Sequence, residues 1–243
     1  MASCLPNLED DSGYALPAAM MLALVLAVTA AGLMARSMTV LRQSKDDLDR
    51  LRIERGLDGA HLLAASAIVS SQTAGPYRWS LASEVGPVEI VADEERAKLG
   101  FAEAAALPAE TLARLGVTDA PALRARLAQA AESPLPPLTA DLDTAPTWRF
   151  CAPALISPLG RSQALQYTIP TEPGPGTLPA SWRIGEVWRV SIVTPGGWRD
   201  DRLVRFTGDA SRPNATVARR FFRTTTTGEQ SGCEELLSGL VSG

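Results

Sequence analysis

The longest pattern in the sequence is an uninterrupted apolar run near the N-terminus. Residues 14–34 read YALPAAMMLALVLAVTAAGLM, and residues 12–35 contain no charged side chain. At about 1.5 Å of rise per residue, this run is about 30 Å long as a helix, which matches the hydrocarbon thickness of a bilayer. We therefore predict a transmembrane helix over residues 14–34.

The helical pattern continues where the apolar run stops. No proline occurs between Ala35 and Ser71, so the span and its polar extension are predicted to form one long helix. Residues three or four apart in the extension form one modest apolar stripe. The stripe comprises Leu57, Ala60, His61, Ala64, Ala67 and Ile68. We predict that residues 35–72 are the amphipathic continuation of the helix, with a face that packs on a globular domain formed by residues 73–243.

Short strand patterns and one helical stretch make up the rest of the chain. Strands are predicted at residues 78–82, 87–94, 186–194, 201–208 and 216–223. Helices are predicted at residues 107–115 and 120–131, and Thr118 or Asp119 can cap the second. They lie in a helical insertion at about residues 95–132, followed by proline-rich connections at 133–146 and 171–179.

The last three strand patterns predict the fold class. Trp188, Val190 and Ile192 alternate with polar residues, and the two following segments alternate as well, which is typical of an antiparallel meander with one buried face. Such a face would pack on the amphipathic half of the long helix. We therefore predict an α+β fold: a long N-terminal helix on an antiparallel sheet, with a small helical insertion.

Composition narrows the classes of function. The chain is 46% hydrophobic and 21% charged, which indicates a folded protein. Its net charge is -4 and its arginines are scattered, so no nucleic-acid partner is expected.

Cysteine and histidine offer little chemistry. Cys4 lies near the N-terminus, apart from Cys151 and Cys233. These two either form a disulfide in an oxidising compartment or remain buried free thiols. His61 is the only histidine and no CxxC spacing occurs, so a zinc site is not expected and His61 is interpreted as a structural residue.

Catalytic motifs are also missing from the sequence. It contains no GxSxG, phosphate-binding glycine loop, HExxH or dinucleotide fingerprint, so we do not expect an enzyme. Asp93, Glu94 and Glu95 can supply oxygen ligands to calcium, or they are solvated carboxylates at a helix start. We assign no metal ligand and no other cofactor. The Asn214-Ala-Thr216 glycosylation pattern carries no weight by itself.

The segment before the span distinguishes it from a secretory signal peptide. Such a peptide has a basic start and a shorter apolar core, whereas residues 1–13 read MASCLPNLEDDSG, with three acids and no lysine or arginine. A short leader ending in Gly13, an uncharged span that starts at Tyr14 and an amphipathic continuation together resemble a type IV prepilin-class N-terminus. The resemblance implies cleavage after Gly13 by a prepilin peptidase and methylation of Tyr14.

The residue at the fifth mature position differs from that of most members of this class. Most members have a glutamate at the fifth mature position, where it neutralises the N-terminal ammonium of a neighbouring subunit, but this chain has Ala18 there. An uncompensated charge in an apolar fibre core is costly. A subunit without this glutamate therefore fits a fibre tip, as the K component of type II secretion systems does.

Two further segments resemble that K component: LDRLRIERGLDGAHLLAASAIV in the second half of the long helix and PVEIVADEERAKLGFAEAAALPAETLARLGV after it. The resemblance implies a pilin-like fold and a minor pseudopilin that nucleates the pseudopilus for export of folded proteins. It implies an inner-membrane location with the C-terminal domain in the periplasm. The implied partners are the I-type and J-type minor pseudopilins, the inner-membrane secretion platform and the prepilin peptidase.

Two alternatives share parts of this pattern. A minor pilin of a type IV pilus would have the same N-terminus. An unprocessed, membrane-anchored binding module would have only the span. Positive-inside counting predicts the opposite orientation, because the leader is acidic while Arg36, Arg42 and Lys45 follow the span. We give the geometry of the processing site more weight than this count.

Overall fold

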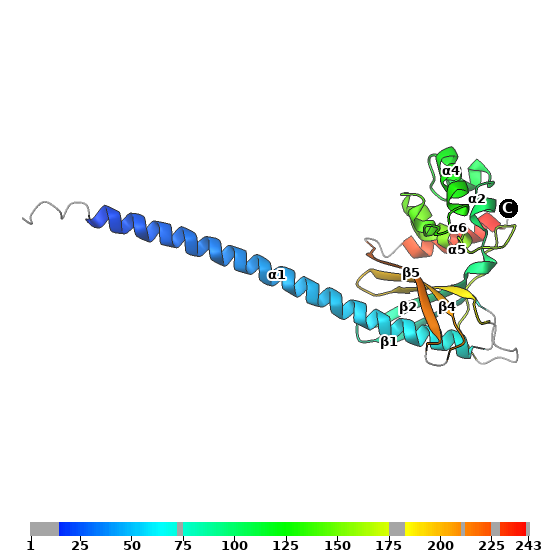
Figure 1. Cartoon of the computed structure of the whole chain (residues 1–243), viewed down its shortest axis with the longest axis horizontal. Coiled ribbons are helices and arrows are strands. Elements are labelled where there is room, and N and C mark those ends of the chain that lie inside the picture. Colours follow the sequence, from blue (N-terminus) through cyan, green and yellow to red (C-terminus); the bar gives the residue numbers. More distant parts are fainter. Residues whose placement is uncertain (1–14, 72–74, 175–182, 210–211, 225–228, 242–243) are drawn as a thin grey trace, which may run out of the picture. The chain divides into compact units, whose positions relative to one another are not determined.

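The chain consists of one long helix, a five-stranded sheet and a group of shorter helices. A computed structural model describes residues 15–71, 75–174, 183–209, 212–224 and 229–241 (Figure 1). The chain divides into two compact units between Glu54 and Arg55. Helix α1, Ala15–Ser70, runs through this boundary without a break, so the prediction of one long, apolar N-terminal helix is confirmed.

The sheet is a continuous antiparallel meander, as predicted. It has the order β1-β2-β3-β4-β5. Its strands are β1 (Tyr77–Ser83), β2 (Gly86–Glu94), β3 (Val187–Val193), β4 (Trp198–Phe206) and β5 (Asn214–Arg223). Gly86 takes a φ of 98° in the tight β1–β2 turn, a conformation that favours glycine. The α+β fold class is therefore confirmed at the level of a long helix and an antiparallel sheet.

Both faces of the sheet are buried at its strands β3 and β4, which corrects the expectation of a single buried face. Six of the seven β3 residues are buried, because the sheet lies between α1 and the shorter helices (Figure 1). On one face, Asp200 of β4 lies 3.6 Å from His61 of α1. On the other face, Arg199 stacks on Phe150. Alternation within a strand places Arg199 and Asp200 on opposite faces.

The helices that cover the second face come mainly from the connection between β2 and β3. They are η1 (Glu95–Ala97), α2 (Phe101–Ala104), α3 (Ala109–Arg114), α4 (Ala120–Ala131), η2 (Thr139–Asp141) and α5 (Pro146–Leu155). The backbone N–H of Ala122 donates to the Asp119 carboxylate at 2.9 Å, which caps α4. This helical connection runs to Leu155, beyond the expected end at residue 132.

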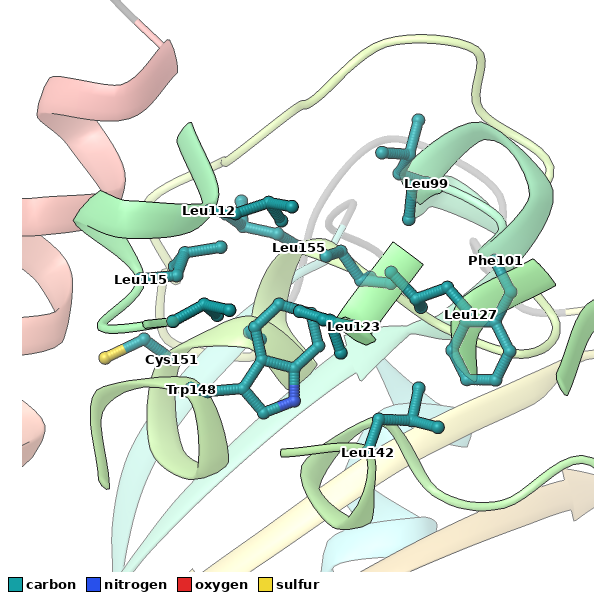
Figure 2. Close-up of a cluster of buried hydrophobic side chains, with 14 of the residues drawn as sticks. Leu99, Phe101, Leu112, Leu115, Leu123, Leu127, Leu142, Trp148, Cys151 and Leu155 are labelled. Carbon is teal, nitrogen blue, oxygen red and sulfur yellow. The ribbon is translucent and has the colours of Figure 1, made fainter. Parts of the chain in front are cut away.

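The subdomain has a core of its own. Trp148 of α5 is fully buried among leucines from α3 and α4 (Figure 2), and its indole N–H donates to the carbonyl of Thr139 at 2.8 Å. Helix α6, Glu229–Val241, returns after β5 and adds Cys233 and Leu237 to this core. The core is therefore assembled from two separate stretches of sequence.

Candidate functional site

The first unit presents an apolar helix surface that none of the described residues covers. Every described side chain of α1 up to Leu51 is exposed. The large apolar side chains from Leu16 to Met34 are between 57% and 74% exposed. A folded protein rarely leaves so large an apolar surface in water. Among the described residues, α1 is the one helix long and apolar enough to cross a membrane, and such surface suits that environment.

Thr29 is the one polar side chain between Leu16 and Met34, and its hydroxyl is satisfied within the helix. Its Oγ1 donates to the carbonyl of Val25 at 2.9 Å or to that of Leu26 at 3.0 Å. A polar group in hydrocarbon needs an internal partner. The segment therefore presents no polar side chain that needs water.

Of the residues predicted to act in processing and assembly, Ala18 is the one that the structure describes. Gly13 and Tyr14 fall outside the described residues. Ala18 lies in the first turns of α1 and is exposed, and that helix has no acidic residue in its first turn. The methyl side chain of Ala18 carries no charge and cannot neutralise the N-terminal ammonium of a neighbouring subunit.

A buried carboxylate joins the second half of α1 to the sheet. Asp200 is fully buried, and its Oδ2 lies 2.6 Å from Nη2 of Arg202 and 3.0 Å from Nη2 of Arg219. Burial raises the pKa of Asp200, but its contacts with His61, Arg202 and Arg219 outweigh burial and hold the pKa well below its usual range. Arg202 also contacts Asp58 of α1. The group therefore connects helix and sheet by charge as well as by apolar packing.

His61 is a packed structural residue, in agreement with its interpretation from the sequence. It is 6% exposed and lies on the α1 face of the sheet. Burial lowers its pKa more than the nearby Asp200 raises it, and the charge of Arg202 lowers it further. The neutral imidazole is therefore the favoured form at neutral pH.

A second buried carboxylate joins the sheet to the helical subdomain. Glu95 is 0% exposed and accepts two hydrogen bonds from Arg189 of β3, at 2.9 and 3.2 Å. It also accepts from Nζ of Lys98 at 2.6 Å and from the Ser157 hydroxyl. Burial raises the pKa of Glu95, but the charges of Arg189 and Lys98 outweigh it and hold the pKa at about 2. Glu95 is therefore ionised in the folded protein.

The interpretation of the acidic residues before α2 as solvated carboxylates is wrong for Glu95, whereas Asp93 and Glu94 are partly exposed. Glu95 has no contact with solvent, and Asp93 lies 3.4 Å from the same Lys98 ammonium. Both oxygens of Glu95 are already engaged by cations and a hydroxyl. Within the described parts of the chain, no three acidic, histidine or cysteine side chains gather closely enough to hold a metal ion.

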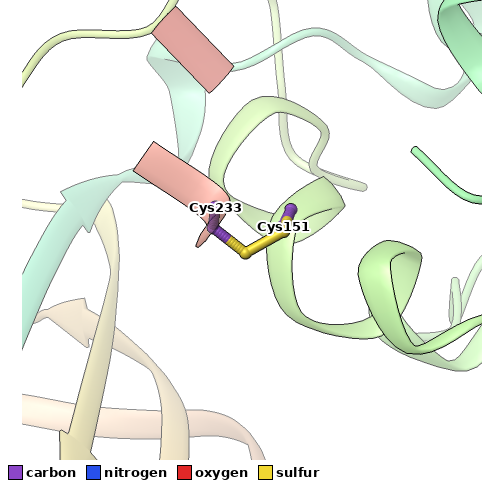
Figure 3. Close-up of a disulfide and its surroundings, with 2 residues drawn as sticks. All are labelled: Cys151 and Cys233. Atoms are coloured by element: carbon purple, nitrogen blue, oxygen red, sulfur yellow. A yellow bond between two sulfur atoms is a disulfide. The ribbon is translucent and has the colours of Figure 1, made fainter. Parts of the chain in front are cut away.

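A disulfide joins the two stretches that form the subdomain core. Cys151 of α5 and Cys233 of α6 are bonded, with their Cα atoms 5.3 Å apart and a sequence separation of 82 positions (Figure 3). Near the disulfide, Arg78 of β1 forms an ion pair with Glu234. The disulfide therefore fixes the C-terminal helix to the subdomain.

The central positions of Arg189, Asp200 and Lys98 in these buried contacts were not predicted from the sequence. A signal for the first two was present, because charged residues interrupt the apolar alternation of the third and fourth strands. Charged residues within a strand usually indicate an exposed face. Here they are buried because partners from η1 and α1 meet them from both sides.

Comparison with known proteins assigns no family. No protein-family model matches the sequence, and neither the curated proteins nor the solved structures include a significant match.

Proposed function

We propose that the protein is a minor pseudopilin of a type II secretion system, at the tip of the pseudopilus, and that it is not an enzyme. The observation that carries this proposal is α1, a helix with an uncovered apolar first half and a second half that packs on an antiparallel sheet. A subunit of this form can leave the membrane and pack the same apolar surface against neighbouring helices. The leader ending in Gly13 and the alanine at position 18 narrow the proposal to a tip subunit.

In this proposal, the span anchors the chain in the bacterial inner membrane with the second unit in the periplasm. The apolar helix packs beside those of the I-type and J-type minor pseudopilins. At position 18, the methyl side chain of Ala18 stands where most members have a glutamate, whose charge a tip subunit does not need. The secretion platform would then extend the fibre behind this subunit. Growth of the fibre would move folded proteins through the outer membrane.

The decisive experiment is the intact mass of the membrane-extracted protein, expressed with and without a prepilin peptidase. We expect the loss of residues 1–13 and the gain of one methyl group on Tyr14 only when the peptidase is present. Gly13→Leu should abolish the cleavage, whereas Gly32→Leu, at a glycine with no neighbouring atoms within 4 Å, should leave it unchanged. A chain that stays intact with an active peptidase would refute the pseudopilin class.

One observation favours a second candidate function. Acidic residues precede the span and Arg36 and Arg42 follow it, the charge order of a protein whose C-terminal part stays in the cytoplasm. An unprocessed, membrane-anchored binding module would have this orientation. Protease protection in spheroplasts separates the two, because only a periplasmic second unit is digested when the outer membrane alone is opened.

Secretion and piliation are distinguished in a deletion strain. A tip pseudopilin is required for the release of exoproteins, so these would accumulate in the periplasm when the gene is deleted. A minor pilin of a type IV pilus would instead be required for surface fibres or twitching motility. Restoration by the full-length gene, but not by the Gly13→Leu variant, would link the phenotype to processing.

A further inference from the structure

The two edges of the sheet are covered differently. At the β1 edge, the backbone N–H of Arg78 donates to the carbonyl of Thr171 at 2.8 Å, and the N–H of Thr171 donates to that of Pro76 at 3.0 Å. At the opposite edge, the backbone of β5 pairs only with β4 among the described residues. An open edge offers a row of N–H and C=O groups to another strand. The strand that offers it is 10 residues long, the longest in the sheet.

The open edge has a single sign of charge. Strand β5 contains three arginines and no acidic residue. Two of them have acidic partners in the folded unit, since Arg219 lies 3.0 Å from Asp200 and Arg220 lies 3.5 Å from Asp141. Arg223 is exposed and forms no ion pair within the described residues, and the same is true of Arg205 on β4. The edge therefore keeps an excess of positive charge.

Aromatic contacts hold this edge in a defined conformation. The Phe221 ring stacks on Trp198 of β4, with ring centroids 4.9 Å apart. The Arg223 guanidinium lies 5.8 Å from the Trp198 ring, and that of Arg220 lies 4.5 Å from the Phe222 ring. Such contacts reduce the freedom that a strand would lose on pairing. The edge is therefore organised before any partner arrives.

We propose that β5 is a docking edge for an extended, acidic segment of a partner protein, which adds to the sheet as a further strand. Backbone groups would give the affinity, and a carboxylate opposite Arg223 would select the partner. A second copy of this chain is a poor occupant, because pairing two copies of β5 brings arginines close to arginines. The same charge protects the isolated protein from association through this edge.

The proposal does not depend on the pseudopilin assignment, because it uses only residues of the second unit. We would test it on the full-length protein in detergent with a labelled peptide of the same length as β5, in which glutamate alternates with valine and threonine. Fluorescence anisotropy reports binding, and hydrogen exchange followed by mass spectrometry reports where it occurs. We expect the glutamate peptide to bind and to slow amide exchange in residues 214–223. A peptide with lysine in place of glutamate should do neither.

Charge reversal adds an independent test. Arg223→Glu should weaken binding of the glutamate peptide by about twofold to fivefold, from the usual strength of exposed ion pairs. Arg161→Glu, which reverses an exposed arginine in the connection after α5, should leave the affinity unchanged. Failure of the glutamate peptide to bind, or binding without slower exchange in β5, would overturn the proposal. The exchange measurement on the unmodified protein is valid whether or not the variants fold.

Discussion

The two halves of α1 belong to one helix but differ in the exposure of their apolar side chains. Up to Glu54, leucines and methionines remain exposed, including Met21 at 74%. Beyond that residue, Leu57, Ala64 and Ile68 are 0% exposed against the sheet. Helix propensity is therefore not what separates the halves. The difference is the surroundings: the sheet covers one face of the second half, while no described residue covers the first half.

The largest effect should come from removing the carboxylate that joins the folded unit together. Glu95→Gln removes the carboxylate that accepts from buried Arg189 and Lys98 and leaves Lys98 with the more distant Asp93. This loss costs about 3–5 kcal/mol of the free energy of unfolding. Urea unfolding followed by tryptophan fluorescence measures this loss. Membrane association should not change, because the first half of α1 is untouched. Glu110→Gln, at an exposed residue of α3, is the control and should shift stability by less than about 0.5 kcal/mol.

A pair of leucines tests the comparison on the second half of α1 itself. Leu57 is 0% exposed and Leu62 is 64% exposed. Leu57→Ala should destabilise the second unit by about 2–5 kcal/mol through lost burial and a residual cavity. Leu62→Ala should change the stability by less than about 0.5 kcal/mol. Equal effects in thermal unfolding would contradict the packing of this helix on the sheet.

In the first half of α1, a charged substitution should have a larger effect than a smaller apolar side chain, because the property at stake is membrane insertion. Leu26→Arg places a cation at the centre of the apolar run and should oppose membrane insertion by about 2.5–3.5 kcal/mol. Carbonate extraction of membranes measures the insertion, and the unfolding midpoint of the second unit serves as the readout expected to stay constant. Leu51→Arg, on the same helix beyond the apolar run, should remain inserted. Retention of both variants would argue against a transmembrane role.

The smallest effect concerns mild acid. Because the pKa of Glu95 is lowered from 4.5 to about 2 in the folded protein, the unfolded chain binds this proton first as pH falls. The stabilisation from Glu95 is therefore complete above about pH 4.5 and is lost progressively towards pH 2. Unfolding midpoints measured across this range should decline less steeply for Glu95→Gln than for the unmodified protein. Parallel pH profiles would show that another group is responsible.

Local pattern was sufficient for much of the fold. The long helix followed from an uncharged run and a proline-free extension, and all five strands lie within a few residues of their predicted positions because each one alternates. Helix α5 was missed because Pro146 and Pro153 lie in a helix of 10 residues. Helix α6 was missed because its apolar positions are separated by glycines and serines. The contribution of α6 to the subdomain core is known only from its packing against α5.

The charged contacts were less predictable than the elements. The ion pair between Glu95 and Arg189 joins residues 94 positions apart, and no local pattern shows which cation such a carboxylate will meet. The same holds for Asp200, whose partners come from α1, β4 and β5. The opposite holds for Gly13, predicted for processing, and Ala18, predicted for assembly, because both predictions rest on local sequence alone.

The return of α6 to the helical subdomain has a consequence for the order of events in synthesis. Residues 99–156 provide most of that core, but Cys233 and Leu237 come from the last helix of the chain. Synthesis must therefore continue past Leu237 before the subdomain can close. Until then its apolar surface is open to chaperones and proteases. A premature stop codon shortly before Cys233 should leave a chain that reaches the membrane and is degraded there.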